Sequence, residues 1–429
     1  FLMIEKRGRY MSADKSENRL DMRKTFLIGL GFFSSSLLWS VYNSFVPLIL
    51  RGFISSTTLI GSIMTIDNIF GVIFQPLFGM LSDRTRTPIG KRMPYIMIGA
   101  PVCGILFALI PRMRSLIALM AIVILFNFVM SIWRSPMIAL MPDLTPEKQR
   151  SQANGIINLM GGLAAILAFL VGGKLADAYG RAATFQMASG TLLIAVILLF
   201  IFVKEKKLPD PAVSGAGESE LDSLRNGGFG AFRRLDPKRR RGLGLILLAI
   251  FFWFCAFNAV ETFFTLYATT TFGLTDGQAA MTLAFFSVSF VAFAIPAGFI
   301  GARIGRRQTI LLGLIGMIAV FLPMNFISNL TVVRVLLLLA GLGWACVNIN
   351  SLPMVLNFAN EAELGTFTGY YYFFSFAAAI FSPILFGVLR DSSGTYATLF
   401  VYAPVCFALA CVCVFLFRQD AATVDETQA

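Results

Sequence analysis

Long apolar runs separated by short polar breaks extend along almost the whole chain. Each run is long enough to cross the hydrocarbon core of a membrane, which takes about 20 helical residues. The pattern predicts twelve transmembrane helices, over residues 25–50, 57–81, 94–112, 115–140, 152–176, 183–203, 243–272, 278–301, 308–328, 331–358, 364–390 and 396–418. We therefore expect an all-α polytopic membrane protein.

One long polar stretch, residues 204–242, divides the predicted helices six and six. It contains the small-residue run 214–217 and the basic run 238–241, both typical of a segment outside the membrane. We expect a cytoplasmic N-terminal segment over 1–24, an N-terminal six-helix bundle over 25–203, a cytoplasmic linker over 204–242, a C-terminal six-helix bundle over 243–418 and a cytoplasmic tail over 419–429.

Basic residues are unevenly distributed between the predicted loops. With both termini in the cytoplasm, 27 of the 35 Lys and Arg residues fall on the cytoplasmic side and seven on the outer side. This bias sets the orientation of membrane proteins. It also explains the net charge of +12 without a nucleic-acid partner. The short loops favour a bacterial inner (plasma) membrane, where we expect a monomer in the lipid bilayer.

The composition excludes several kinds of chemistry. The chain contains no histidine, which excludes Ser-His-Asp triads, histidine metal ligands and histidine proton relays. Its six cysteines lie within apolar runs and are interpreted as small core residues. No nucleotide-binding GxxxxGK[ST] motif is present. We therefore expect no enzymatic activity, catalytic residues, metal site or cofactor, and transport would draw its energy from an ion gradient.

Motifs of the first six predicted helices recur in the second six, which indicates a duplication. Two six-helix bundles related by such a repeat are typical of alternating-access carriers. The counterparts are Gly79 and Gly298, Ser135-Pro136-Met137 and Leu352-Pro353-Met354, Trp39 and Trp253, and Asp177 and Asp391, at offsets of 219, 217, 214 and 214 positions.

Two longer motifs carry a family resemblance. Residues 75–95 read QPLFGMLSDRTRTPIGKRMPY, and residues 134–144 read RSPMIALMPDL. The first motif and its echo at 298–307 resemble the signature of the major facilitator superfamily, and this resemblance covers nearly the whole chain. The first motif resembles the glycoside/pentoside/hexuronide cation symporters and the related plant-type sucrose transporters. The second motif resembles the helix 4 signature of the sucrose-transporter branch. The resemblance implies the major facilitator fold, with a substrate site near the membrane midplane between the bundles.

Two departures from the family pattern limit what the resemblance implies. Melibiose-type symporters bind their cation through two aspartates in helix 2, and the equivalent positions here are Gly71 and Gln75. A sodium site is therefore not expected, and the proton is the expected coupling ion. In the second-half loop motif, Ala302 replaces the aspartate, which leaves that loop without its acidic partner.

Three ionisable residues lie within predicted helices. A charge at a helix centre costs about 3 kcal/mol even on a lenient insertion scale, so such residues indicate function. Glu261 is the first candidate for proton coupling and Asp67 the second, because a carboxyl group in apolar surroundings can pick up and release a proton. Glu261 could instead form a static pair with Arg134 or face water near the outer interface, and Asp67 could be structural.

Arg134 offers planar, fixed donors that can hold sugar hydroxyls or neutralise a carboxylate. The alternative is a cytoplasmic ion pair with Asp83 or Asp143. All four tryptophans fall on helices 1, 4, 7 and 10, which line the central cavity in this superfamily, and aromatic faces suit the apolar faces of sugar rings. Interfacial tryptophans and helix-bonding asparagines are the alternative. The predicted substrate-binding residues are Trp39, Tyr42, Asn43, Asn127, Trp133, Arg134, Trp253, Asn258, Trp344, Asn348 and Asn350.

The charged loop motifs suggest a gate at the cytoplasmic face. An ion-pair network there can stabilise one arrangement of the halves and break as they rock. Positive charge that only sets topology would explain the basic residues but not Asp83. The predicted gating residues are Asp83, Arg84, Lys91, Arg92, Asp143, Arg303 and Arg306.

Together these features predict a secondary active transporter, a proton-coupled symporter of a sugar or glycoside. The first alternative is a carrier or exporter of another amphipathic solute, drug-like or a lysolipid. The second is a membrane sensor that does not transport.

Overall fold

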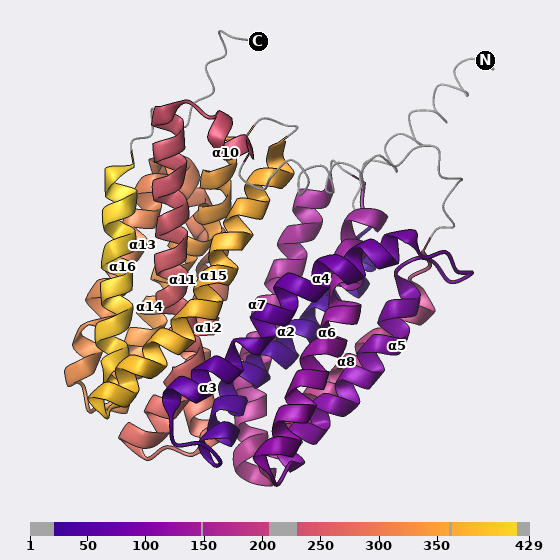
Figure 1. Ribbon diagram of the computed structural model, residues 1–429, viewed down its shortest axis with the longest axis horizontal. Helices are drawn as coiled ribbons and strands as arrows, with labels where there is room; N and C mark the ends of the chain where they lie inside the picture. The colour runs from indigo at the N-terminus through magenta and orange to yellow at the C-terminus, as the bar shows by residue number, and fades with distance from the viewer. Residues whose placement is uncertain (1–20, 147–148, 206–229, 360–362, 418–429) are drawn as a thin grey trace, which may run out of the picture.

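The computed structural model describes residues 21–146, 149–205, 230–359 and 363–417, and every regular element in these ranges is helical (Figure 1). The N-terminal half contains α2 (Met22–Arg51), α3 (Thr57–Met64), α4 (Ile66–Arg84), α5 (Met93–Leu109), η1 (Ile110–Arg112), α6 (Leu116–Leu144), α7 (Arg150–Tyr179) and α8 (Arg181–Phe202). The C-terminal half contains α10 (Gly230–Arg234), α11 (Pro237–Phe272), α12 (Asp276–Ile304), α13 (Arg306–Phe321), η3 (Pro323–Phe326), α14 (Leu330–Leu356), α15 (Leu364–Ser393), η5 (Tyr396–Thr398) and α16 (Leu399–Leu416).

Twelve membrane-spanning helices are confirmed among the described residues. The second span consists of α3 and α4, which are interrupted at Thr65, whose hydroxyl donates back to the Ser62 carbonyl at 2.8 Å. Such side-chain bonds to the backbone compete with regular helix bonding. Most of the predicted linker lies outside the described residues, so the predicted domain boundaries stay predictions.

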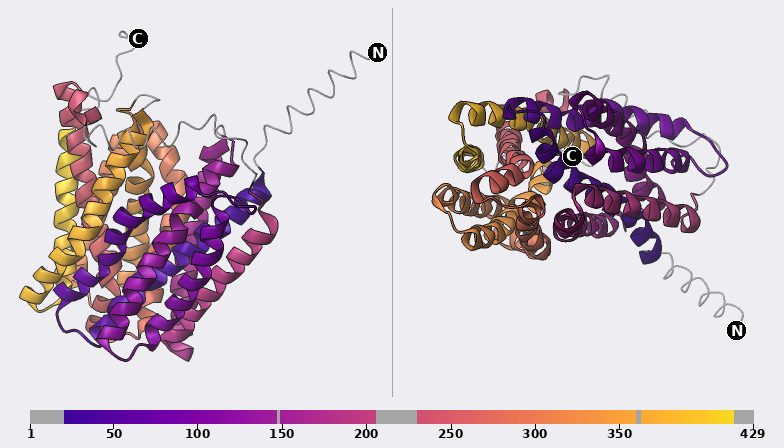
Figure 2. Two further views of the ribbon diagram at one scale, coloured as in Figure 1. Left: turned by 45° about the vertical axis from the view of Figure 1, so that its right-hand side comes forward. Right: turned by 90° about the horizontal axis from the view of Figure 1, so that it is seen from below.

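The two halves lie side by side, with the indigo-to-magenta half next to the orange-to-yellow half in Figures 1 and 2. Across the interface, α7 packs against α12 and α3 packs against α15. The start of α2 and the end of α16 lie at the same end of the molecule (Figure 1). This arrangement is the predicted pair of bundles.

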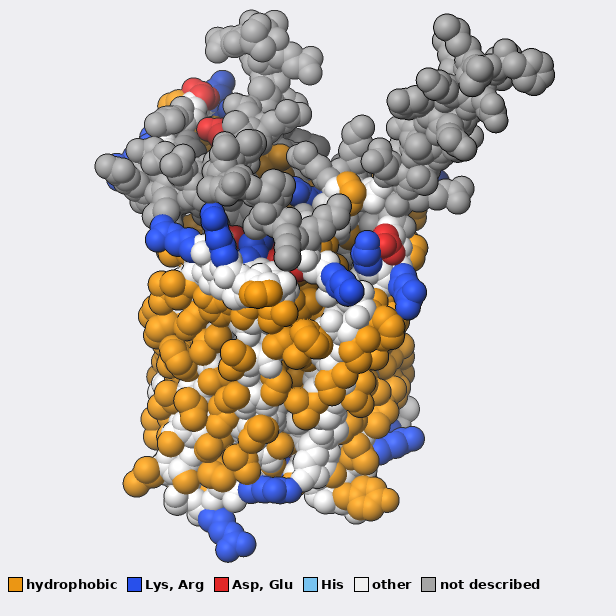
Figure 3. Space-filling view, turned by 90° about the vertical axis from the view of Figure 1, so that its right-hand side faces the viewer, with side chains coloured by type: hydrophobic (Ala, Val, Ile, Leu, Met, Phe, Trp, Pro, Cys, Tyr) orange, Lys and Arg blue, Asp and Glu red, His pale blue; other side chains and the backbone are white. Residues whose placement is uncertain are grey.

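Apolar side chains form a band across the face that Figure 3 shows, and Lys and Arg gather mainly at the end where α2 begins. Isoleucines such as Ile98 and Ile117 are largely exposed on the surface, as a lipid-facing surface requires. The band and the position of the basic residues fit an integral membrane protein with its cytoplasmic end where α2 begins.

Candidate functional site

A charged cavity of about 180 Å³ lies between the two halves. Helices α2, α3, α4 and α6 of the N-terminal half and α11 and α15 of the C-terminal half contribute to its wall. The lining residues are Trp39, Asn43, Met64, Asp67, Asn68, Gln75, Arg134, Asn258, Glu261, Thr262, Phe376, Ala379 and Pro383. Because both halves form the wall, a relative movement of the halves changes the site.

The three ionisable residues predicted from the sequence all line this charged cavity. Asp67 lies in the first turn of α4, where the helix dipole favours a negative charge. Its carboxylate accepts bonds from the backbone N–H and the side-chain amide of Asn68, each at 2.7 Å. Glu261 comes from α11, and the Asn43 side chain lies within hydrogen-bonding reach of its carboxyl group.

Arg134 projects from α6 into the same cavity. Its guanidinium carbon lies 5.5 Å from the centre of the Trp39 ring, within the range of a cation–π contact. The alternative of a cytoplasmic pair with Asp83 or Asp143 is wrong, because those carboxylates pair with Lys91 and Arg92 instead. Arg134 is thus the positive group of a site that also holds two carboxyl groups.

An apolar cavity of about 220 Å³ adjoins the charged one, and Glu261 lines both. Aromatic side chains dominate its wall, where Phe257 and Trp344 stack at 4.3 Å between ring centres with nearly parallel planes. The lining residues are Ser40, Gly161, Gly162, Ala165, Phe169, Phe257, Val260, Glu261, Leu283, Phe286, Ser287, Phe290, Met317, Phe321, Leu337, Trp344 and Phe407.

The predicted substrate-binding residues divide into those on a cavity wall and those within the packing. Trp39, Asn43, Arg134 and Asn258 line the charged cavity, and Trp344 lines the apolar one. The other six lie outside both walls. Five of these are buried, namely Tyr42, Asn127, Trp133, Trp253 and Asn350, whereas Asn348 is partly exposed.

Hydrogen bonds explain the position of the two buried asparagines. The Asn127 amide donates to the Val123 carbonyl at 2.9 Å and lies 3.4 Å from the Tyr42 hydroxyl. The Asn350 amide donates to the carbonyls of Ala297 and Cys346. Both side chains therefore join helices, which is the alternative considered for polar residues in membrane spans.

Several lining residues were not predicted from the sequence. Asn68 follows Asp67 directly, and Gln75 stands where melibiose-type symporters have a cation-binding aspartate, so both carried a signal. Phe376 is one of 43 phenylalanines, and nothing in the sequence distinguishes it from the others.

A cytoplasmic network of ion pairs joins the ends of α4 and α6 to the loop before α5. Arg92 is buried and pairs with Asp83 and, at 3.0 Å, with Asp143. Lys91 lies 3.1 Å from Asp143 and 3.7 Å from Asp83. These pairs bring together four of the predicted gating residues, and all four belong to the N-terminal half.

The other predicted gating residues lie elsewhere. Arg306 donates to the Pro353 carbonyl and the Asn357 side chain, each at 2.9 Å. Arg84 and Arg303 are exposed. The C-terminal half thus binds its loop arginine through uncharged acceptors, as expected from the missing aspartate at Ala302.

Known carriers resemble the chain in sequence. Multidrug resistance protein MdtG of Serratia proteamaculans is 25% identical over 330 residues, which cover 74% of this chain and 75% of that protein. The MdtG protein of a Rahnella species is 24% identical over 408 residues, which cover 89% of this chain and 90% of that protein. The name of these relatives does not confirm the predicted sugar-symporter branch. Bacterial relatives and twelve spans support a protein of the bacterial inner membrane.

The fold resembles solved carriers. A bacterial homologue of the human lysosomal transporter Spinster, in an inward-facing and occupied conformation, has a TM-score of 0.74 at 14% identity, covering 94% of this chain and 98% of that chain. The nucleoside transporter NupG has a TM-score of 0.71 at 12% identity, covering 92% and 98%. At such identities the likeness concerns the fold alone. The sequence model of the Major Facilitator Superfamily matches residues 28–373 and 266–429, and the chain therefore belongs to this superfamily.

Proposed function

We propose that the protein is a proton-coupled exporter of amphipathic, drug-like solutes that works by alternating access. The main support is the charged cavity between the two halves. Asp67 of α4, Arg134 of α6 and Glu261 of α11 all line it. The multidrug resistance name of the relatives supports a drug-like solute. Carriers of this architecture bind their solute between the halves.

The two carboxyl groups supply the proton chemistry. Charged groups inside a membrane bundle are expensive and serve as ion or proton sites. With both carboxylates ionised, Asp67 and Glu261 outweigh the single positive charge of Arg134, so the cavity attracts a cation or a hydrogen-bond donor. Protonation of Glu261 removes one negative charge and weakens that attraction. Proton entry and solute release are thereby coupled, as exchange across the membrane requires.

The experiment reconstitutes the protein in liposomes with the pH dye pyranine inside and imposes an ethidium gradient. We expect ethidium to drive proton movement with the unmodified protein and Glu261→Gln to abolish this movement. Asp236→Asn is the matched control, because Asp236 caps α11 outside the membrane. The proposal would be contradicted if the pH inside liposomes with the unmodified protein did not respond to the ethidium gradient. Proton movement as large in Glu261→Gln as in the unmodified protein would also contradict it.

A second candidate is proton symport of a sugar or glycoside. The amides of Asn43, Asn68 and Asn258 and the ring of Trp39 share the charged cavity, and amides with one aromatic face suit a hydroxyl-rich ring. The same liposomes, tested with mono- and disaccharides, distinguish the two. Sugar-driven proton entry without an ethidium response would favour this candidate.

The cytoplasmic network is proposed to act as a gate. Its carboxylates lie at the ends of α4 and α6, so movement of these ends changes the ion pairs. Asp83→Asn is expected to reduce transport and leave the amount of protein in the membrane unchanged. Full transport by Asp83→Asn would mean that the network stabilises the structure and does not act as a gate.

A further inference from the structure

The apolar cavity is large for a space inside a packed bundle. An apolar cavity of about 150 Å³ stays dry and binds benzene, and this one measures about 220 Å³. Phe257, Phe286, Phe290 and Trp344 form its aromatic wall. Because this wall is largely apolar, contact with it removes apolar surface of a solute from water, so an apolar occupant would be bound favourably.

We propose that the apolar cavity is a second subsite, which holds the fused aromatic end of a solute whose cationic end lies beside Glu261 in the charged cavity. This inference rests on the proposed function and narrows its substrate class to aromatic cations with two distinct ends. Glu261 lines both cavities, so one solute can reach across it. The ionised carboxyl groups attract the cationic end, and the aromatic wall excludes water from the other.

The test measures binding of three probes to the purified full-length protein by calorimetry: benzyl-, naphthylmethyl- and anthracenylmethyl-trimethylammonium. They share the cationic end and differ in ring number. Leu283→Phe narrows the apolar cavity, because Leu283 lines it. The matched control is Leu312→Phe, since Leu312 is 59% exposed on α13.

We expect affinity of the unmodified protein to rise with ring number. Leu283→Phe should weaken binding of the anthracenyl probe about tenfold, as excess volume in an apolar pocket does, and leave the benzyl probe unchanged. Equal affinities for all probes, or equal loss in both variants, would overturn the subsite. Since binding is measured without transport, rising affinities combined with an absent ethidium response would refute the exporter and retain the subsite.

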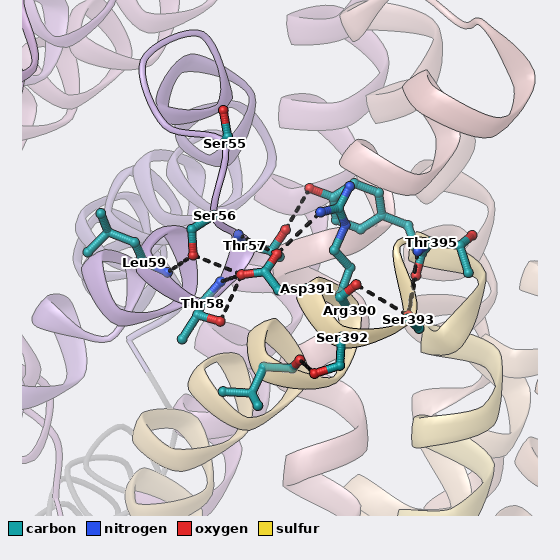
Figure 4. A network of polar contacts seen from close by, with 12 residues as sticks. Ser55, Ser56, Thr57, Thr58, Leu59, Arg390, Asp391, Ser392, Ser393 and Thr395 are labelled. Atoms are coloured by element: carbon teal, nitrogen blue, oxygen red, sulfur yellow. Dashed lines mark hydrogen bonds and ion pairs between the residues drawn. The ribbon is translucent and has the colours of Figure 1, made fainter.

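The outer ends of the two halves carry a different feature, centred on Asp391 at the end of α15 (Figure 4). This carboxylate accepts bonds from the backbone N–H groups of Thr57 and Thr58 at 2.8 and 2.9 Å. It also accepts from the hydroxyls of Ser56 and Thr58, at 2.8 and 2.9 Å. Asp391 of the C-terminal half thus caps the N-terminus of α3 in the N-terminal half.

The opposite pair of helices shows the same arrangement with the halves exchanged. Asp177, near the end of α7 in the N-terminal half, accepts a bond at 3.0 Å from the backbone N–H of Gly277. Gly277 lies in the first turn of α12 in the C-terminal half. Arg181 pairs with Asp276 in the same turn. We call the contacts of Asp177 and Asp391 the outer caps.

The outer caps are related by the internal repeat. Asp177 and Asp391 are 214 positions apart, and Thr58 and Gly277 are 219 positions apart, as expected from the offsets of the motifs. Each aspartate also has a glycine four residues before it, Gly173 or Gly387, on the same helix face. A Cβ at Gly173 would lie 2.7 Å from the Gly277 carbonyl oxygen, and one at Gly387 would lie 2.7 Å from the Thr57 oxygen.

We infer that the outer caps form a twofold-repeated lock that holds the outer side closed. A carboxylate at a helix N-terminus is stabilised by charge-assisted bonds and the helix dipole. These contacts join opposite halves, so they must break whenever the outer ends separate. The two glycines allow the close approach that brings each carboxylate to its helix end.

The test is a distance measurement between spin labels at Phe53→Cys and Ser392→Cys in membranes. The background is a transport-competent variant lacking the six native cysteines. The experiment compares Asp391→Ala, the double variant with Asp177→Ala, and Asp236→Ala. The last removes a helix cap within one half and is the matched control. Gly387→Ala is a second route, because its methyl group meets the backbone of the opposite half.

We expect each lost outer cap to lower the ratio of outer-closed to outer-open molecules about fivefold, the effect of losing a typical cap. The label distances should therefore move to longer values in Asp391→Ala, further in the double variant and likewise in Gly387→Ala. Asp236→Ala should keep the original distances. Unchanged distances in both the double variant and Gly387→Ala would overturn the inference.

Discussion

At the cytoplasmic end of the N-terminal half, Arg92 binds two carboxylates, whereas Arg306 at the matching end of the C-terminal half binds a backbone carbonyl and an amide. In the membrane, Trp39 faces the charged cavity, whereas its repeat partner Trp253 is fully buried. The outer caps, by contrast, recur in both halves, although Asp391 accepts from two backbone N–H groups and Asp177 from one. The two halves of the duplicated chain thus share a contact between helices at their outer ends. They differ at their cytoplasmic ends and in the surroundings of the paired tryptophans.

The largest expected difference concerns the two arginines. Arg92→Gln leaves two carboxylates with Lys91 alone. Arg92 is buried but both carboxylates are partly exposed, so the cost should be about 2 kcal/mol, between that of an exposed and that of a buried pair. Arg306→Gln removes bonds to uncharged acceptors and costs about 1 kcal/mol. Thermal unfolding in detergent should therefore show the larger drop in melting temperature for Arg92→Gln. Equal drops would remove the proposed asymmetry of the cytoplasmic ends.

The tryptophan pair should separate stability from binding. Trp253→Phe leaves unfilled space in a packed core and should cost on the order of 1 kcal/mol of stability, with unchanged probe affinity. Trp39→Phe should change the melting temperature less and weaken probe binding slightly, because Trp39 lines the cavity proposed to hold the cationic end of the probe and Trp binds a cation more strongly than Phe. Melting curves and calorimetric titrations of both variants check this. The reverse assignment of the two effects would mean that Trp39 is a packing residue.

Introducing a carboxylate at Ala302 tests the effect of the aspartate that the loop motif of the C-terminal half lacks. Ala302 is exposed, and Ala302→Asp offers a carboxylate to the neighbouring arginines. Exposed pairs contribute about 0.5 kcal/mol, so the melting temperature should rise slightly at low salt and return to the original value at high salt. A salt-independent change would point to a cause other than the restored pair.

The smallest effect is expected for the two exposed gating candidates. Arg84→Gln and Arg303→Gln should each change stability by less than about 0.5 kcal/mol, as is usual at surface sites. Transport should also be retained. A marked loss of transport in either variant would mean that the arginine acts in another conformation of the transport cycle. The comparison of the two halves would then have to include that conformation.

The sequence predicted the fold well because apolar length and charge bias depend on local composition. It also singled out Asp67, Arg134 and Glu261, which the structure places on the wall of one cavity, since a charge in a membrane span is conspicuous wherever it lies. It could not separate Trp39 from Trp133, because belonging to a cavity-lining helix does not say which face a side chain takes. Apart from Glu261 and Trp344, the wall of the apolar cavity has no sequence signal, since it combines residues from both halves that resemble ordinary core.

The outer caps could be predicted from the sequence only in part. The repeat of Asp177 and Asp391 was visible from their spacing, yet the partners that the two aspartates have in common are backbone N–H groups of the opposite half. Backbone groups carry no sequence signature, so only the packing of α3 against α15 and α7 against α12 reveals the contact.

This feature has a consequence for variation of the protein. The donors of each outer cap include main-chain N–H groups, which every residue except proline supplies. Most substitutions in the first turns of α3 and α12 would preserve these donors, except at Gly277, where a Cβ would lie 2.0 Å from the Gly173 carbonyl oxygen. A single change at either aspartate removes the acceptor. Natural variants and engineered carriers can therefore adjust the strength of the outer closure through two positions, with the main-chain donors held constant.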